Sequence, residues 1–345
     1  MENKEIYKDE DVTASSRKED HITLSFKSQQ NRMQIDKRFY YEPMLSPHLQ
    51  DKTALHTQFA GHELKLPLWV SSMTGGTEKA RTINHNLAKA CGEYGFGMGL
   101  GSCRSLLFSD EYFPDFNVKK WIGEFPLYAN LGIAQVEILA QEGDWQRIRD
   151  MVSKLNADGL IIHVNPLQEW LQPEGDRFKE APIDVIKRAI DALDMPIIVK
   201  EVGQGMGPKS LEALLNLPLA AVEFAASGGT NFATIELFRA DPLRQAMLKP
   251  VSHVGHTAEE MVNMVNSIAD SGNPVVENLI ISGGVKDFLD SYYLRNRSKI
   301  HAISGHASAF LKHALEGYDA LCQYIEIQRE GMMMASSFLT VRNPV

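Results

Sequence analysis

Eight short apolar segments recur along this chain, and nearly all of them end in glycine or in polar residues. They are Leu68–Ser72, Phe96–Leu100, Leu127–Asn130, Gly159–Ile162, Pro196–Lys200, Ala220–Ala225, Leu279–Ile281 and Ile300–Ser304. Apolar strands that alternate with amphipathic helices indicate parallel pairing, and eight such units predict a (β/α)8 (TIM) barrel of the α/β class. The carboxyl ends of the strands in that fold surround one pocket. We therefore expect the residues that follow the eight segments to build the functional site.

Helical spacing between the segments supports this arrangement. After the first segment, apolar residues recur at intervals of four and three, at Ile83, Leu87, Cys91 and Tyr94. This pattern predicts a helix that ends at Gly95, and Pro182 suits the first turn of a later helix. Residues 306–326 are predicted to form the last helix. The connections 171–181 and 240–255 are long for a barrel and are expected to fold over the pocket as lids.

The composition excludes several classes of partner. Asp and Glu (44) outnumber Lys and Arg (35), so the formal charge of −9 gives no overall positive field for nucleic acid or an anionic membrane. The first residues are polar, and no apolar run approaches the roughly 20 residues that span a bilayer. Cys91, Cys103 and Cys322 lie far apart, which argues against a disulfide framework or a structural zinc site. We expect a cytoplasmic protein.

The sharpest local pattern follows the fourth segment and reads His163-Val164-Asn165-Pro166-Leu167-Gln168-Glu169. In an extended strand His163 and Asn165 point to the same side, and Pro166 ends the strand so that Gln168 and Glu169 turn over the barrel mouth. One carboxylate among neutral polar groups suits Mg²⁺, which keeps most of its waters and uses substrate phosphate oxygens. On the residues alone, a solvated Glu169 and a hydrogen-bonded core His163 remain an open alternative.

Glycine-rich turns follow the last three segments, at Gly228-Gly229-Thr230, Ser282-Gly283-Gly284 and Gly305-His306-Ala307-Ser308. Glycine lets backbone N–H groups approach an anion, and a helix that starts there adds the positive end of its dipole. One such turn is usually just a tight turn. Because barrels commonly bind phosphate after strands seven and eight, the last two turns together predict a bound phosphate.

Other strand ends could hold a flat ring. Met73-Thr74-Gly75-Gly76 offers a nearly bare backbone, while Asn130 and Lys200 supply an amide and a cation. A lysine that closes an apolar strand needs an anion or an electron-rich ring system. A pair with Glu201 or Glu223 is the purely structural explanation. A phosphate, a flavin or a Schiff-base carbonyl are the functional ones.

Two further groups could hold an anionic substrate. Arg17, Lys18 and His21 cluster near the N-terminus, although such a cluster is usually a solvated face. Ser102 and Arg104 follow the second segment and are better placed, since arginine can grip a phosphate with two parallel hydrogen bonds.

Taken together, these motifs resemble the type 2 isopentenyl-diphosphate isomerases over about residues 15–315. The matching motifs are Arg17-Lys18-x-x-His21, Met73-Thr74-Gly75-Gly76, Ser102-x-Arg104, His163-x-Asn165-x-x-Gln168-Glu169, Lys200-Glu201-Val202-Gly203, Gly228-Gly229-Thr230 and Ser282-Gly283-Gly284. The N-terminal Arg17-Lys18-x-x-His21 motif together with the His163-x-Asn165-x-x-Gln168-Glu169 motif separates this family from other flavin-binding barrels. Its members interconvert isopentenyl and dimethylallyl diphosphate with reduced FMN, Mg²⁺ and NADPH, without net redox change.

The resemblance implies a role for each matched residue. It places the flavin ring and ribityl chain on Ser72, Met73, Thr74, Ser102, Asn130, Lys200 and Thr230, and the flavin phosphate on Gly283, Gly284, Ala307 and Ser308. It places the substrate diphosphate on Arg17, Lys18, His21, Ser102, Arg104, His163 and Asn165, with Gln168 at the isoprenyl carbons and Glu169 on Mg²⁺. His163 and Gln168 are then the catalytic candidates beside a flavin that transfers protons.

The residues and the resemblance together imply an organisation. Residues 1–65 are polar and lack steady periodicity, so on the residues alone we expect an N-terminal extension with a short strand or two before the barrel of residues 66–345. The resemblance implies that the extension contributes a substrate-binding segment, that the barrel binds FMN, and that the protein is a homo-oligomer (tetramer or octamer). The chain departs from relatives on the FMN side. Ala225-Ala226 replaces a usual Ser-Gly pair, Val285-Lys286-Asp287-Phe288 replaces the usual continuation after strand seven, and His306 is added.

Two other functions are compatible with these residues. An FMN-dependent 2-hydroxy-acid oxidase or dehydrogenase would share Lys200 and the phosphate turns, but it needs a catalytic base beside a substrate carboxylate and no diphosphate clamp. A flavin-binding or phosphate-binding barrel without catalysis is the other, and the Ala225-Ala226 change is consistent with it.

Overall fold

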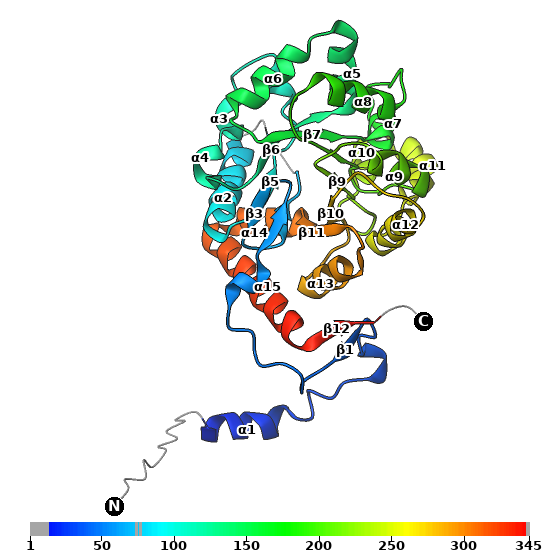
Figure 1. The fold of residues 1–345 in the computed structure, drawn as a ribbon. Helices are drawn as coiled ribbons and strands as arrows, with labels where there is room; N and C mark the ends of the chain where they lie inside the picture. The colour runs from blue at the N-terminus through cyan, green and yellow to red at the C-terminus, as the bar shows by residue number, and fades with distance from the viewer. Residues whose placement is uncertain (1–13, 73–74, 76–77, 343–345) are drawn as a thin grey trace, which may run out of the picture.

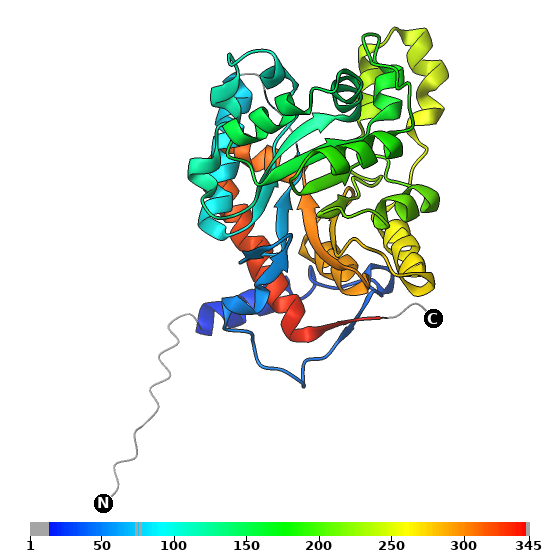
Figure 2. The same cartoon turned by 45° about the horizontal axis from the view of Figure 1, so that its top comes forward.

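A closed barrel of eight parallel strands forms the centre of the computed structural model, which describes residues 14–72, 75 and 78–342 (Figure 1 and Figure 2). Around the barrel the strands are β4 (Leu68–Val70), β5 (Gly97–Gly99), β6 (Leu127–Gly132), β7 (Gly159–His163), β8 (Ile197–Lys200), β9 (Ala221–Glu223), β10 (Asn278–Ser282) and β11 (His301–His306). All eight predicted strands and the (β/α)8 fold class are confirmed.

Helices surround the barrel and connect its strands. They are α2 (Glu78–Tyr94), α3 (Phe113–Phe116), α4 (Lys119–Ile122), α5 (Ile133–Glu142), α6 (Trp145–Lys154), α7 (Pro166–Leu171), α8 (Pro182–Ala192), α9 (Pro208–Leu215), α10 (Phe232–Arg239), α11 (Pro242–Ser252), α12 (Ala258–Ser271), α13 (Phe288–Arg297), α14 (Ser308–Glu316) and α15 (Tyr318–Phe338). As predicted, α2 ends before Gly95, whose φ of 79° suits glycine, and α8 has Pro182 in its first turn. Within the described residues, no helix is both long enough and apolar enough to cross a membrane.

The C-terminal part of the chain differs from the prediction. The single helix expected over 306–326 is two helices, α14 and α15, because Gly317 between them has a φ of 137° that interrupts the helix. The apolar face nevertheless continues across the break, with Phe310 and Ala314 buried before it and Leu321 and Ile325 buried after it. Most of the expected lid over 240–255 is the regular helix α11.

The N-terminal extension closes the end of the barrel where the strands begin. It contains a hairpin of β2 (Thr57–Phe59) and β3 (His62–Leu64), after the 3₁₀ turns η1 (Arg32–Gln34) and η2 (Lys52–Leu55). Ala60 and Gly61 at its tip both have positive φ, of 48° and 84°, as tight hairpin turns require. Phe59 packs on Trp69 with ring centroids 5.5 Å apart, and Trp69 packs on Tyr128 at 5.9 Å. These rings fill the lower barrel, so space for a ligand lies at the carboxyl end.

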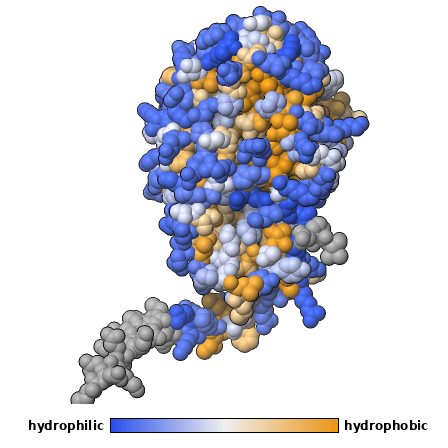
Figure 3. Space-filling model, in the orientation of Figure 1, coloured by the Kyte–Doolittle hydropathy of each residue, from blue (hydrophilic) through white to orange (hydrophobic). Residues whose placement is uncertain are grey.

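The two ends of the described chain meet beneath the barrel. β1 (Phe39–Tyr41) pairs antiparallel with β12 (Leu339–Val341), and α1 (Ala14–Leu24) lies beyond this pair, on the side where the barrel strands begin (Figure 1 and Figure 2). Short strands in the extension were predicted, whereas α1 was not. Phe26 (81% exposed), Met33 (89%) and Met44 (88%) belong to this extension. Figure 3 shows some apolar surface at this lower end and a larger apolar band over the upper part of the face in view.

Gly92 tests the packing of α2 against α4. A Cβ at this position would lie 2.1 Å from the carbonyl oxygen of Trp121. Helix propensity alone favours alanine over glycine by about 1 kcal/mol, but that contact would push the two helices apart. We expect Gly92→Ala to lower the free energy of unfolding by about 1–3 kcal/mol in urea denaturation. Ser267→Ala, on the exposed face of α12, is the control, with a change below about 0.5 kcal/mol. A Gly92→Ala protein as stable as the parent would contradict this contact.

Candidate functional site

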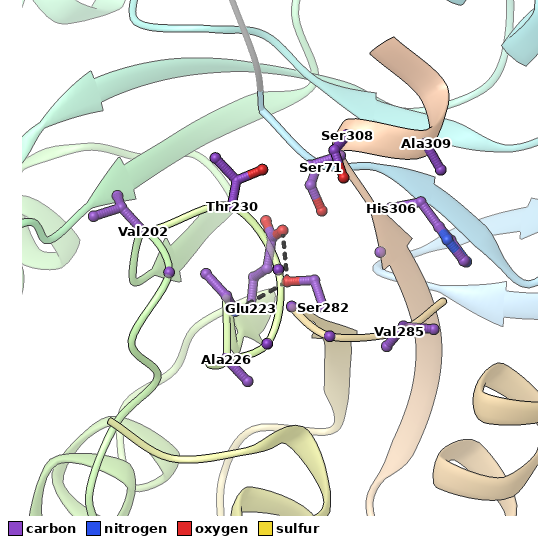
Figure 4. Close-up of a pocket in the computed structure, with 18 of the residues that line it drawn as sticks. Ser71, Val202, Glu223, Ala226, Thr230, Ser282, Val285, His306, Ser308 and Ala309 are labelled. Atoms are coloured by element: carbon purple, nitrogen blue, oxygen red, sulfur yellow. Dashed lines mark hydrogen bonds between the residues drawn. The ribbon is translucent and has the colours of Figure 1, made fainter. Parts of the chain in front are cut away.

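Two adjoining cavities lie at the carboxyl end of the barrel. The larger one, of about 420 Å³, is lined by residues at the ends of β4, β8, β9, β10 and β11 (Figure 4). The smaller one, of about 140 Å³, is lined by residues that follow β5, by residues in β6 and at the end of β7, and by Gln168 on α7. Both share Ser72, Lys200, Val202 and Phe232. Strand ends that are far apart in sequence therefore meet at one site, as the barrel pattern predicts.

Most of the predicted site residues line these cavities. They are Ser72, Ser102, Asn130, His163, Gln168, Lys200, Thr230, Gly283, Gly284, Ala307 and Ser308. Arg104 lies nearby in the 3₁₀ turn η3 (Arg104–Leu107), with its Nη1 3.4 Å from Oδ2 of Asp176. Met73 and Thr74 lie outside the described residues.

Arg17, Lys18 and His21 are not brought to the cavities. They are exposed on α1, on the side of the barrel opposite the cavity mouth (Figure 2). Their predicted role in substrate binding therefore requires α1 to lie at the mouth of a barrel, which is not its position in this structure.

His163, at the end of β7, is oriented by a chain of hydrogen bonds on neighbouring strands. Its Nδ1 lies 2.7 Å from Oδ1 of Asn130, whose Nδ2 donates to the Leu100 carbonyl at 2.9 Å. Since the amide nitrogen is used as a donor, Oδ1 accepts, so Nδ1 carries the proton and Nε2 is left as an acceptor. Burial, with a smaller effect of the positive charge on Lys200, lowers the pKa of His163 to about 3. The ring is neutral at physiological pH.

Gln168 is held in α7 by two neighbours. Its Oε1 accepts from Nδ2 of Asn165 at 3.1 Å, and its Nε2 donates to Oε1 of Glu236 at 3.2 Å. Glu236 on α10 is 4% exposed and forms an ion pair of 2.5 Å with Arg239. Sequence reasoning missed Glu236, because nothing in the pattern of α10 indicates that one of its acids faces α7.

Glu169, the predicted metal ligand, lies beside Gln168. Its Oε1 accepts from Nδ2 of Asn165 at 2.9 Å, and its Oε2 accepts from the backbone N–H of Asp176 at 2.7 Å. The Oδ1 of Asn165 is buried without a partner. Asp176 belongs to the predicted lid 171–181, which is thereby attached to α7. The described residues contain no group of three or more His, Cys, Asp or Glu side chains arranged for a metal.

Lys200 is 6% exposed at the end of β8, and its Nζ donates to the carbonyl of Glu201 at 2.7 Å. The Glu201 carboxylate instead accepts from the backbone N–H groups of Gly203 and Gln204, both at 2.6 Å. Glu223 is the register partner of Lys200 on β9, yet no ion pair between Lys200 and either acid occurs in the described part of the chain. Burial raises the pKa of Glu201, and backbone N–H groups and the positive charge of Lys200 oppose that shift. Lys200 thus interacts with Glu201 without a direct ion pair, and it also lines both cavities.

The turns after β9 and β10 form one backbone cradle. Ala225 has a φ of 45°, which is unusual for a residue with a side chain, and its N–H donates to Oγ of Ser282 at 3.0 Å. Gly283, with a φ of 85°, packs so closely that a Cβ would lie 2.1 Å from the carbonyl oxygen of Ala226. The cradle thus requires glycine at position 283.

His306 ends β11 and lines the larger cavity. It is 3% exposed, neither ring nitrogen has a partner, and its ring meets Phe310 edge-on at 5.9 Å. Burial lowers the pKa of His306 to about 4. This added histidine is therefore a neutral ring at the wall of the cavity.

No protein-family model matches the chain. An isopentenyl-diphosphate delta-isomerase of Rickettsia africae is 32% identical over 316 residues, which cover 90% of this chain and 89% of the relative. The chain belongs to the isopentenyl-diphosphate delta-isomerase family. It is therefore an isomerase by class. The enzyme of the same name from Rickettsia felis is 35% identical over 271 residues, covering 78% of this chain and 75% of the relative.

Similar solved structures share the barrel. A flavocytochrome b2 mutant with benzoylformate has a TM-score of 0.60 at 13% identity and covers 89% of this chain and 79% of its own. A mandelate oxidase mutant with a monooxide FMN adduct has a TM-score of 0.52 at 12% identity and covers 89% of each chain. At such low identity the likeness shows the fold alone.

The neutral state of His163 predicts a loss of stability in acid. Its pKa falls from an ordinary 6.5 to about 3 on folding, so between these values the unfolded chain binds more protons. Stability contributed by the neutral ring is present above pH 6.5 and is lost as the pH falls towards 3. His163→Gln should therefore lose less stability than the parent between pH 7 and pH 5 in urea denaturation. His253→Gln, at an exposed position, should lose as much as the parent. Equal losses in all three proteins would contradict a neutral His163.

Proposed function

We propose that this protein interconverts isopentenyl diphosphate and dimethylallyl diphosphate in isoprenoid biosynthesis, with reduced FMN and with Mg²⁺ on the substrate diphosphate. The observation that carries the proposal is the junction of the two cavities at Lys200. One cavity offers glycine turns and hydroxyl groups, and the other offers Asn130, His163 and Gln168. The curated relatives named isopentenyl-diphosphate delta-isomerase support this assignment.

The larger cavity fits FMN. Gly283, Gly284 and the start of α14 at Ser308 present backbone N–H groups suited to a phosphate, and Lys286 and Lys312 line the same cavity. Reduced FMN would supply an acid/base group and an electron-rich ring that stabilises a developing cation, with NADPH as the source of its electrons. Lys200 would hold the ring, together with Ser72, Ser102, Asn130 and Thr230. Met73 and Thr74 remain predicted contacts.

The smaller cavity would hold the isoprenyl diphosphate. Phe232 and Val202 line it beside Gln168 and exclude water, which a carbocation-like intermediate requires. Gln168 would present its amide to the isoprenyl carbons, with Glu236 fixing its orientation. Nε2 of neutral His163 would be free to accept a hydrogen bond at the diphosphate, whose charge would favour protonation of the ring. Ser102, Arg104 and Asn165 would hold the diphosphate.

Mg²⁺ fits the oxygen atoms beside α7. Glu169 would supply a carboxylate oxygen, and the unpartnered Oδ1 of Asn165 lies in the same hydrogen-bonded group. Mg²⁺ often uses only one or two protein ligands and completes its shell with water and phosphate oxygens.

The extension would complete the substrate site. Arg17, Lys18 and His21 would bind the diphosphate after α1 reaches the mouth of its own barrel or of a neighbouring one. We further propose a homo-oligomer, a tetramer or octamer, supported by the exposed Phe26, Met33 and Met44. The three cysteines are free thiols, which agrees with a cytoplasmic location.

Anaerobic assays of the purified protein test the activity. With FMN, Mg²⁺ and either NADPH or dithionite, the protein should convert isopentenyl diphosphate to dimethylallyl diphosphate, as measured by NMR of the products. Omission of FMN or of Mg²⁺ should abolish turnover. Net oxidation of a 2-hydroxy acid by the oxidised protein would instead select the oxidase alternative, and bound flavin without turnover of either substrate would select the non-catalytic barrel.

Glu169 tests the metal assignment. In Glu169→Gln, the Mg²⁺ concentration that gives half-maximal activity should rise by roughly 10- to 100-fold, because the amide lacks the negative charge of the carboxylate. FMN binding, measured by fluorescence, should change by less than about twofold, because Glu169 does not line the larger cavity. Glu174→Gln, an exposed acid paired with Arg239, is the matched control and should keep the parental Mg²⁺ dependence. An unchanged requirement in Glu169→Gln would remove the metal assignment.

A further inference from the structure

Glu223 is a fully buried acid at the floor of the larger cavity, with 0% of its surface exposed. Its Oε1 accepts a hydrogen bond from Oγ of Ser282 at 3.0 Å, and its Oε2 has no partner. Figure 4 shows the carboxylate pointing into the cavity, between Ser71 and Thr230. Among the described residues that line this cavity, Glu223 is the only one with a carboxylate.

A buried carboxylate oxygen without a donor is unfavourable, so Glu223 needs a partner. Among the described residues, none provides it. Lys200 is the register neighbour of Glu223, but its Nζ donates to the carbonyl of Glu201. Ser282 already serves the other carboxylate oxygen. A ligand in the cavity can supply the donor that Oε2 lacks within the described part of the chain.

The surroundings of Glu223 indicate what kind of donor fits. The hydroxyl groups of Ser71 and Ser72 are buried at the same cavity and also lack partners. Ser71 and Ser282 both lie against Gly305. A Cβ added to Gly305 would lie 2.6 Å from Oγ of Ser71 and 2.7 Å from Cβ of Ser282. One carboxylate and several hydroxyl groups thus form a continuous polar floor. A phosphate would be repelled there, an apolar group would leave the floor unpaired, and a chain of hydroxyl groups would satisfy it.

We propose that Oε2 of Glu223 accepts a hydrogen bond from a ribityl hydroxyl group of FMN, and that this contact selects flavins with a polyhydroxyl side chain. The inference rests on the proposed function, because FMN is taken as the ligand. The order of the strands supports it. The glycine turn after β10 and Lys200 at the end of β8 lie on either side of β9, so a ligand that reaches both crosses Glu223.

A binding cycle tests this contact. FMN and an analogue with a phosphorylated N10-pentyl chain, which lacks the hydroxyl groups, are titrated into the parent and Glu223→Gln proteins by flavin fluorescence. The dissociation constant for FMN should rise roughly tenfold or more in Glu223→Gln, because a charged acceptor is lost. The constant for the analogue should change by less than about twofold. Equal changes for both ligands, or no change for either, would overturn the assignment while leaving the proposed function intact. A parent protein that does not bind FMN would defeat both.

Two further variants make the test independent of folding. Glu137→Gln, at a buried acid on α5 that lines neither cavity, should leave the affinity for FMN unchanged. Glu223→Asp keeps the charge but shortens the side chain by one methylene group, which withdraws the carboxylate from the cavity. It should therefore weaken the binding of FMN more than the binding of the analogue. If Glu223→Gln does not fold, Glu223→Asp decides the question by the same comparison, and equal binding of FMN to Glu223→Asp and the parent would refute the contact.

Discussion

Closure of eight parallel strands is the constraint on which the rest of this structure depends. Pairing of β9 with β10, β10 with β11 and β11 with β4 brings Glu223, Ser282 and Ser71 to one polar floor, although they are far apart in sequence. Below them the barrel is filled by Trp69, Tyr128 and the hairpin residue Phe59. A ligand can therefore enter only from the carboxyl end. The polar layer above the aromatic rings then decides which chemical groups the ligand must carry.

The two halves of the site differ in how far their polar groups are satisfied by the chain itself. Around the smaller cavity, His163 is bound to Asn130, and Gln168 lies between Asn165 and Glu236, although Oδ1 of Asn165 has no partner. On the other side, Ser71, Ser72, His306 and one oxygen of Glu223 have no partner. Buried polar groups without partners cost free energy, and a ligand that pairs with them recovers it. This difference is what we expect of a site where one ligand stays bound while another is exchanged at every turnover.

The sequence predicts the parts of this protein that depend on local pattern. Apolar runs located all eight strands, and Gly95 and Pro182 marked helix ends. Gly317 was missed because apolar spacing continues across it, and only its backbone φ of 137° divides the helix. The placement of α1 was not predictable, because its mostly polar residues show no buried face. Glu236 is likewise visible only in three dimensions, since its contact with Gln168 joins two helices that lie 68 positions apart.

Ala225 shapes how the turn after β9 is held against β10. Ala225 keeps a left-handed φ of 45° without the freedom of glycine, a conformation that costs free energy and persists only with support. Ser282 provides that support, because its Oγ accepts from the N–H of Ala225 while donating to Glu223. One hydroxyl group thus couples the strained turn to the buried acid. Removal of that hydroxyl would disturb both at once, so the cradle depends on Ser282.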